Sequence, residues 1–511
     1  MNSGPARALL AQAGAALTVS ALIAGCGNNY RPVVTPITPS GPAAQVTSYV
    51  VVVSTTGTTT AGVATIIDYS GDTVMAVAPI GVGPYAFTID ELGSEGYTIN
   101  SDGTLTNFPI TTSLQAKNVT QSTLPFTAQP VNMMAPSSGL WAADLNGNVA
   151  DVFSGSPQTF KLAIPLVNTL PVSVFGPPTL TGQREYVLSQ NVPDTATGEM
   201  ECNSSPRTAP DGSANPIEIA SNTADPPITV GKCPVYGVQS SDLRRMFVLN
   251  RGDDTVTVIN SQDNTLDNQC PAPTGCVNQN GQTYFTHPVL PLSTDAVAAT
   301  GVTPPNGTAG MAATAGPVFA EYNFATQQLV VANYDGGTVS VIDVSLDEYG
   351  NDSSTFGTTY TIPVGNTATP NPASVTVLAD GSKAYTANQN DGTENGTVTV
   401  VNLSTHQVEK TLTVVGHPRT VASTQNSEYS KVYVASPDSP YVTVLESTPT
   451  VTDQIDTTIL IEGDVVDLKV TTQNGNSGNA NFTSRVPGYG QPCNLPGASH
   501  TDTLTDCRAI Q

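Results

Sequence analysis

The stretch Arg245–Asn260 reads RMFVLNRGDDTVTVIN, and it decides the fold of this 511-residue chain. Its first part is mostly apolar, its last part alternates Thr and Val, and Arg-Gly-Asp-Asp stands between them. Alternation with a period of two residues is typical of a β-strand. Gly and Asp supply the positive φ angles that tight turns between antiparallel strands need. The stretch therefore predicts a β-hairpin.

The hairpin pattern recurs, and an extended run opened by proline precedes each copy. The further hairpins lie at 329–343, 383–402 and 431–445. Proline at the first position of a strand loses no ladder hydrogen bond. A period in the forties with four strands per unit is typical of a β-propeller. Seven such prolines follow one another at intervals of 46, 41, 63, 83, 55 and 46 residues: Pro84, Pro130, Pro171, Pro234, Pro317, Pro372 and Pro418.

The segments Phe247–Asn260 and Thr361–Gly365 resemble the YVTN-type β-propeller repeat of surface and exported bacterial proteins. The resemblance is good over residues 234–450 and weaker over 48–230, where the pattern persists but the signature drifts. It implies a propeller architecture, commonly of seven blades in this family, and specifies function poorly.

The two ends of the repeat region predict how the ring closes. The first unit, 49–54 with 63–69 and 73–78, has no Pro-led strand before it. The late run Val465–Val470 is followed only by a Gly/Asn-rich tail. Pairing these ends removes the exposed edges of an open ring. We therefore expect an all-β propeller of four-stranded blades over residues 47–472, with eight blades, or seven as the alternative.

The N-terminus reads as an export signal. Residues 1–25 hold a short apolar stretch that ends in small residues, which fits a signal peptide better than a membrane span. The ending Leu22–Cys26 resembles the lipobox of bacterial lipoproteins, which implies acylation of Cys26. Residues 26–46 are Pro-rich and read as a tether. We expect a membrane-anchored lipoprotein facing the periplasm or the cell surface; a cleaved signal with a chance Cys is the alternative.

Six cysteines remain in an exported chain, and an even number favours disulfides. Six cysteines allow fifteen pairings, of which pairs of sequence neighbours are the simplest. Such a pairing would give the tail, 473–511, a disulfide loop of its own. No Cys-x-x-Cys occurs and the four His are scattered, which argues against a zinc site. The candidates are Cys202, Cys233, Cys270, Cys276, Cys493 and Cys507.

Composition excludes one class of partner. The formal charge is 17 − 41 = −24, so no basic surface is available for a nucleic acid. No motif of a nucleophilic serine, a metalloprotease, a phosphate loop or a c-type haem is present. We therefore predict no catalytic residue, no metal site and no cofactor.

Four features invite a functional interpretation, and we favour a structural one for each. The oxygen-rich run Asp144–Asp151 lacks the bidentate Glu of a calcium loop, so we expect a polar turn. Arg251–Asp253 spells an integrin-binding tripeptide but occupies a hairpin turn. We expect His417 to be a solvent-exposed loop residue, with a ligand role at the channel mouth as the alternative. We expect the single tryptophan, Trp141, to pack in the core rather than stack on a sugar.

Two insertions, Ser189–Pro216 and Ser293–Gly316, should project from the same face as the hairpin turns. They could form a binding surface or be decoration. We expect a binding or scaffold module that meets an unknown protein or glycan ligand on this loop-bearing face. The alternative is a lactonase-like or other hydrolytic or redox propeller. Acidic or His side chains converging at the channel mouth would favour the enzyme, and a channel lined by Val, Thr and Ala would favour the binding module.

Overall fold

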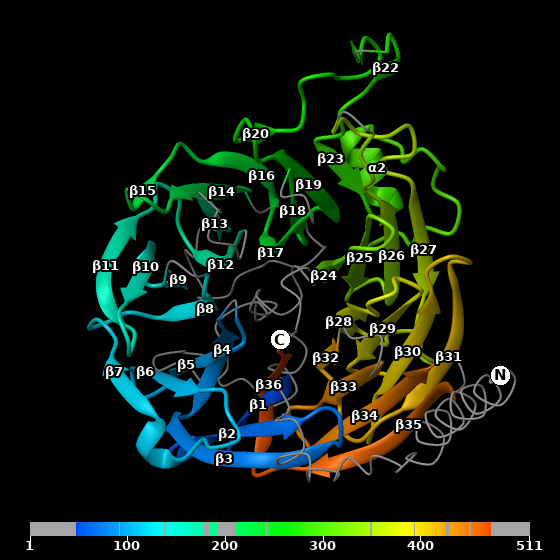
Figure 1. Ribbon diagram of the computed structural model, residues 1–511. Helices are drawn as coiled ribbons and strands as arrows, with labels where there is room; N and C mark the ends of the chain where they lie inside the picture. The colour runs from blue at the N-terminus through cyan, green and yellow to red at the C-terminus, as the bar shows by residue number, and fades with distance from the viewer. Residues whose placement is uncertain are drawn as a thin grey trace, which may run out of the picture. The chain divides into compact units, whose positions relative to one another are not determined.

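The computed structural model describes residues 48–471 except 91, 137–138, 177–183, 192–209, 241–243, 279, 348–349, 393, 425–429 and 449–450. Eight antiparallel sheets follow one another around a central axis, so the described chain is an eight-bladed β-propeller (Figure 1). The predicted fold class is confirmed, with eight blades and not seven. Within the described residues, no helix combines the length and the apolar character that a membrane span needs.

The first four blades are built from strands in sequence order, with one exception in blade 1, where the last of the described strands is innermost. In blade 4 the outermost strand is divided into two pieces. The elements are β1 (Tyr49–Thr55), β2 (Ala61–Asp68) and β3 (Thr73–Val82) in blade 1; β4 (Pro84–Ile89), β5 (Glu95–Asn100), β6 (Thr104–Pro109), the short 3₁₀ helix η1 (Ala116–Asn118) and β7 (Thr120–Thr123) in blade 2; β8 (Pro130–Met134), β9 (Leu140–Asp144), β10 (Val149–Ser154) and β11 (Thr159–Pro165) in blade 3; and β12 (Pro171–Phe175), β13 (Arg184–Ser189), β14 (Asp211–Glu218), β15 (Thr223–Ala224) and β16 (Ile228–Lys232) in blade 4.

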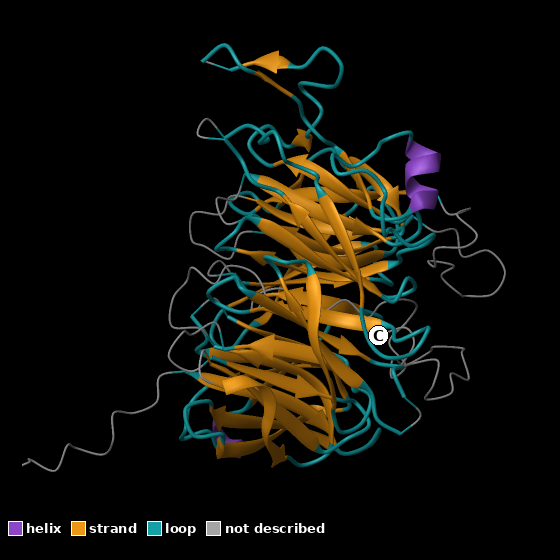
Figure 2. Ribbon diagram, turned by 90° about the vertical axis from the view of Figure 1, so that its right-hand side faces the viewer, coloured by secondary structure: helices purple, strands orange, loops and turns teal. Residues whose placement is uncertain are grey.

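The other four blades repeat this order from the axis outward, and blade 5 also divides its outer strand. Between the two pieces it carries a small two-stranded arm, β21–β22, which projects from the body (Figure 2). The elements are β17 (Pro234–Gln239), β18 (Arg245–Asn250), β19 (Thr255–Asn260), β20 (Thr265–Leu266), β21 (Cys276–Val277), β22 (Thr283–Tyr284) and β23 (Val289–Pro291) in blade 5, then α2 (Thr294–Thr300); β24 (Pro317–Asn323), β25 (Gln328–Asn333), β26 (Thr338–Asp343) and β27 (Thr359–Pro363) in blade 6; β28 (Pro372–Val377), β29 (Lys383–Asn388), β30 (Thr397–Asn402) and β31 (Gln407–Thr413) in blade 7; and β32 (Thr420–Ser423), β33 (Lys431–Ala435), β34 (Tyr441–Thr448) and β35 (Val451–Leu460) in blade 8.

The predicted closure is confirmed. The innermost strand of blade 1 is β36 (Asp464–Val470), which pairs antiparallel with β1 so that Val52 lies opposite Leu468. At the end of this ladder the Tyr49 backbone N–H donates a 2.6 Å hydrogen bond to the hydroxyl of Thr471. One blade is thus shared by both ends of the described chain, which leaves the ring without an open gap.

Six of the seven repeat prolines start the innermost strands β4, β8, β12, β17, β24 and β28, and Pro418 lies just before β32. In each of those six strands the register slips by one residue directly after the proline, which is a β-bulge. The residue before the proline has a positive φ in five blades, including Leu170 at 58° and Cys233 at 50°. A sharp corner therefore brings the chain from each outer strand back to the axis.

In four of the blades, an asparagine at the end of the second strand donates hydrogen bonds to two hydroxyl groups on the third strand. In blade 5 the Asn250 side-chain amide donates to the hydroxyls of Thr255 (3.0 Å) and Thr257 (2.8 Å) on the third strand. The Thr257 hydroxyl in turn accepts from the backbone N–H of Gly231, in the preceding blade, at 3.3 Å. We call this set the Asn/Thr triad. The same pattern holds at Asn100, Thr104 and Thr106 in blade 2, at Asn333, Thr338 and Ser340 in blade 6, and at Asn388, Thr397 and Thr399 in blade 7.

One predicted disulfide, Cys270–Cys276, is present at the base of the arm. Cys233 is disulfide-bonded as well. The other cysteines of the sequence analysis, Cys26, Cys202, Cys493 and Cys507, lie outside the described residues, as do the segments assigned to the signal peptide, the tether and the C-terminal tail.

Candidate ligand-binding face

One end of the ring carries the turns between the second and third strands, for example 101–103, 145–148 and 251–254. The innermost strands begin at this same end, because Pro84 pairs with Asn100 and Pro234 pairs with Asn250. We call this end the hairpin face. The chain crosses from blade to blade here, so the face combines turns, connections and the start of the channel.

The β-bulges lie at the start of the innermost strands, at the hairpin face. The bulged residues are apolar in all seven blades that have one, and four of them belong to a single hydrophobic cluster against which Tyr85 and Ala373 pack. In blade 8 the corresponding place is taken by Arg419, whose guanidinium donates to the backbone oxygen of Val466. The residues are Tyr85, Val131, Val172, Val235, Val318, Ala373 and Val466.

A cavity of about 850 Å³ opens on the hairpin face between blades 2 and 3. The turn 101–103, the connection 123–129 and Asn146 of the β9–β10 turn form its walls, and Tyr85 contributes the side nearest the axis. Phe126 lies on the wall with its side chain 97% exposed. This volume is within the range of small-molecule sites in proteins. We call it the blade 2/3 pocket.

Hydrogen bonds from both blades fix the connection 123–129. The Leu124 N–H donates to the Gly103 carbonyl at 2.9 Å, and Leu124 itself is buried in the core between the two blades. On the other side, the side-chain amide of Asn146 donates to the Thr127 carbonyl at 3.1 Å. The wall that carries the exposed Phe126 ring is therefore held at both ends by the blades beside it.

Two buried carboxyl groups lie behind this wall. Asp144 accepts hydrogen bonds from the backbone N–H groups of Gln129 (2.9 Å), Asn146 (3.0 Å) and Gly147 (3.0 Å). Asp151, on the adjacent strand, is 1% exposed, and burial first and the charge of Asp144 second raise the pKa of Asp151 to about 8. The predicted polar turn over Asp144–Asp151 is thus present, with the Asp144 carboxylate used by backbone donors.

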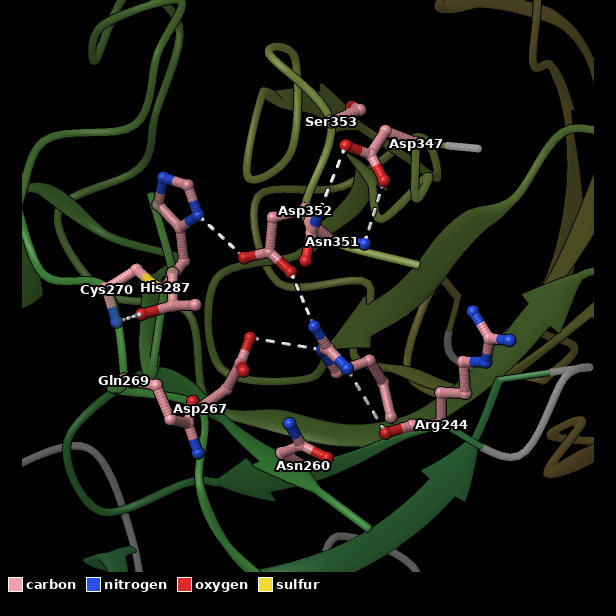
Figure 3. Close-up of polar contacts among 12 residues, drawn as sticks. Arg244, Asn260, Asp267, Gln269, Cys270, His287, Asp347, Asn351, Asp352 and Ser353 are labelled. Carbon is pink, nitrogen blue, oxygen red and sulfur yellow. Dashed lines mark hydrogen bonds and ion pairs between the residues drawn. The ribbon is translucent and has the colours of Figure 1, made fainter. Parts of the chain in front are cut away.

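A second polar cluster joins blades 5 and 6 at the outer rim (Figure 3). The Arg245 guanidinium lies between two buried carboxylates, with Nε 3.0 Å from Asp267 and Nη2 3.1 Å from Asp352. The second oxygen of Asp352 is 2.9 Å from Nδ1 of His287, whose ring stacks on Phe356. Burial raises the pKa of Asp267 to about 7; Asp352 acts in the same direction and Arg245 opposes it.

This cluster is made by two insertions that leave neighbouring blades at the same structural position, after the third strand. Residues 261–288 follow β19 and residues 344–358 follow β26. Arg245 and Asp352 are 107 positions apart in sequence, so no local sequence pattern predicts their pairing. The arrangement neutralises buried charge and ties two blades together, which is a structural role. This cluster was not predicted from the sequence, where the insertion expected between Pro234 and Pro317 was Ser293–Gly316 and not 261–288.

Among the described residues, no group of three or more His, Cys, Asp or Glu side chains is placed to hold a metal ion. Trp141 is 1% exposed and lies in the core between blades 3 and 4, as predicted. The expectation of an exposed His417 is wrong. Its ring is partly buried, and Nδ1 lies 2.7 Å from Asp438, whose other oxygen accepts the His417 backbone N–H.

The tripeptide Arg251–Asp253 forms the predicted turn and is not presented as a ligand. Arg251 is 4% exposed, donates to Asp335 at 2.6 Å and lies over the ring of Tyr334. Asp253 accepts the backbone N–H of Lys232 at 3.0 Å. The arginine thereby links blade 5 to blade 6.

The two predicted insertions differ from expectation. Of Ser189–Pro216, residues 192–209 lie outside the described residues, and Asp211–Pro216 already belong to β14. The ends of Ser293–Gly316 are at the hairpin face, as predicted, because both bind the Asp254 carboxylate. The rest of this insertion is not a free loop: Asn306 pairs with the Thr359 backbone and so covers the outer edge strand β27.

No protein-family model and no curated protein matches the sequence. Solved structures match the fold. Apo AztD from Citrobacter koseri is 13% identical, with 85% of this chain and 99% of that chain covered and a TM-score of 0.52. The dihydro-heme d1 dehydrogenase NirN in complex with DHE is 12% identical, with 84% and 76% covered and a TM-score of 0.53. At this identity the similarity shows that the chain shares the β-propeller fold with these proteins, and no more.

Proposed function

We propose that this chain is an exported, lipid-anchored propeller of the YVTN type that binds a small solute in the blade 2/3 pocket. The observation that carries the proposal is the pocket itself: about 850 Å³, on the face built from turns, with Phe126 97% exposed on its wall. An aromatic ring held in solvent by a fixed loop offers contact area to a ligand at little cost in conformational entropy.

The lactonase-like alternative needs acidic or His side chains that converge at the channel mouth, and it rests on resemblance of fold alone.

The assignment to the YVTN type rests on the sequence resemblance, and the Asn/Thr triads give that repeat a physical reason. The asparagine ends the second strand, and the Thr-x-Thr/Ser pattern of the third strand supplies the hydroxyls that it binds.

The proposals of export and acylation rest on residues 1–26. We expect Cys26→Ser to abolish incorporation of labelled palmitate and to move the protein from the membrane fraction to the soluble fraction; labelling that persists in this variant would contradict the anchor.

Binding is tested with the mature chain by isothermal titration against choline, methyl glucoside and acetate as cationic, neutral glycan-like and anionic probes. We expect Phe126→Ala to weaken whichever probe binds by roughly threefold to tenfold. Leu92→Ala and Val167→Ala are the matched controls, since Leu92 is 80% and Val167 77% exposed outside the pocket. Binding by none of the probes, or binding that ignores Phe126, would count against the pocket; a protein ligand would then remain for this face.

A further inference from the structure

We propose that the blade 2/3 pocket selects an organic cation, an ammonium group with apolar substituents, over neutral and anionic solutes. This inference rests on the proposed binding function and adds the chemical class of the ligand. Three properties of the pocket carry it: the sign of its charges, the aromatic rings at its wall and axis side, and its size.

The charges of the pocket have one sign. Asp102 is the one charged residue among the thirteen that line the cavity, and none of them is Lys, Arg or His. Asp102 is exposed, and its carboxylate accepts the hydroxyl of Thr104 at 2.6 Å and, from β3 of blade 1, the Val82 N–H at 3.2 Å. These hydrogen bonds therefore fix a carboxylate on the wall while leaving it accessible to a ligand.

A second negative charge acts on the pocket from behind. The Asp144 carboxylate is 3% exposed and bonds the backbone of two lining residues, Gln129 and Asn146. Its charge reaches the axis side of the pocket, where burial first and Asp144 second raise the pKa of the lining residue Tyr85. A site of this kind disfavours an anion, and the net charge of −24 acts in the same direction.

Aromatic rings complete the match to a cation with apolar substituents. Phe126 on the wall and Tyr85 on the axis side both line the same cavity. The negative face of an aromatic ring attracts an ammonium group, and alkyl substituents on the nitrogen gain contact with the ring. The cavity of about 850 Å³ is large enough for a molecule with a carbon skeleton, whereas a bare metal ion needs several oxygen or nitrogen ligands converging on one point.

The test compares choline with 3,3-dimethylbutan-1-ol, which has the same shape and no charge, by isothermal titration on the mature full chain. We expect choline to bind at least tenfold tighter than the neutral alcohol, and its affinity to fall as salt is raised. Asp102→Asn, which keeps the size of the side chain, should weaken choline by roughly twofold to fivefold. Asp295→Asn is the matched control, an exposed carboxylate in α2 outside the pocket, and should change nothing.

The outcomes separate the inference from the function beneath it. Equal binding of choline and the neutral alcohol, or Phe126-dependent binding of methyl glucoside without choline, would overturn the cation inference and leave a pocket that binds solutes. Failure of choline to bind would likewise overturn the inference. Only the absence of Phe126-dependent binding for every probe would overturn the proposed function as well.

Discussion

The side-chain amide of Asn250 donates a 2.8 Å hydrogen bond to the hydroxyl of Thr257, and blade 3 replaces both partners by carboxyl groups. The second strand of blade 3 ends in Asp144, which pairs with Val149, and Asp151 follows two residues later on the third strand. In blade 5, Asn250 pairs with Thr255, and Thr257 follows two residues later. Asp144 and Asp151 therefore occupy the positions of Asn250 and Thr257. A neutral donor–acceptor pair has thus become two buried acids. One of them holds a proton near neutral pH, because the pKa of Asp151 is raised to about 8.

Asp151→Thr should therefore stabilise the protein at pH 7. The Asp151 pKa is higher in the folded chain than the ordinary 3.8, so the folded state binds the proton more tightly. Stability contributed by this proton is complete below about pH 4 and falls by about 1.4 kcal/mol per pH unit up to about pH 8. We expect the variant to gain about 2–4 kcal/mol in the free energy of unfolding at pH 7 and little at pH 4, measured by urea titration. A gain of the same size at both pH values would contradict the protonated Asp151.

Glu185 is a second buried carboxyl group, and it is buried more completely than Asp151. The side chain is 0% exposed, and neither carboxyl oxygen has a hydrogen-bond partner among the described residues. Burial raises the Glu185 pKa well above its ordinary value. Glu185 is the second residue of β13, and the second residues of β18, β25 and β29 are Met246, Leu329 and Ala384. An acid thus occupies a position that other blades fill with apolar side chains.

We expect Glu185→Met to raise the free energy of unfolding at pH 7 by about 1–3 kcal/mol, because it removes a buried carboxyl group that has no partner in the described part of the chain. The advantage should widen as the pH rises above 4.5, since the unfolded chain releases the proton that the folded chain keeps. Glu185→Gln is the matched variant: it keeps the shape and stays neutral, so it should remove the pH dependence with less stabilisation. If Glu185→Met proves less stable than the natural chain, the carboxyl group has a partner in solution.

Features that repeat along the chain were predictable, and features that depend on distant contacts were not. Pro84 and its six counterparts marked the innermost strands because proline suits the start of a strand whose N–H needs no partner. The Val465–Val470 strand was found because a ring must close. By contrast, His417 meets Asp438 from another turn, and Phe126 belongs to a connection without any period. Local composition therefore predicts neither the blade 2/3 pocket nor the exposure of the Phe126 ring.

Arg245 is the residue on which the contact between the two rim insertions depends. Replacing it by Leu leaves the carboxyl groups of Asp267 and Asp352 buried without their ion pairs to the guanidinium. We expect a loss of about 3–5 kcal/mol in the free energy of unfolding at pH 8. The loss should shrink at pH 5, because Asp267, whose pKa is raised to about 7, is then protonated. Lys161→Leu, which removes an exposed cation of β11, is the control. An equally large loss in the free energy of unfolding for this variant would contradict the role assigned to Arg245.

Ring closure itself is testable by removing β36. Val465, Leu468 and Val470 are each at most 3% exposed, and β36 also receives hydrogen bonds from blade 8 through Arg419 and Thr420. A stop codon after residue 463 removes this burial, about 1.5–3 kcal/mol for each apolar side chain, and leaves β1 as an unpaired edge. We expect that truncation to aggregate and to lose its cooperative thermal transition.

A stop codon after residue 471 keeps β36 and provides the matched control, which should melt at the temperature of the full chain. A peptide of residues 464–471, added during refolding of the shorter truncation, should restore a soluble monomer by supplying the missing strand in trans. Size-exclusion chromatography and thermal melts distinguish these cases. A shorter truncation that stays monomeric and melts like the full chain would mean that the β1–β36 pairing contributes little, since seven blades and an incomplete eighth would then suffice to hold the ring.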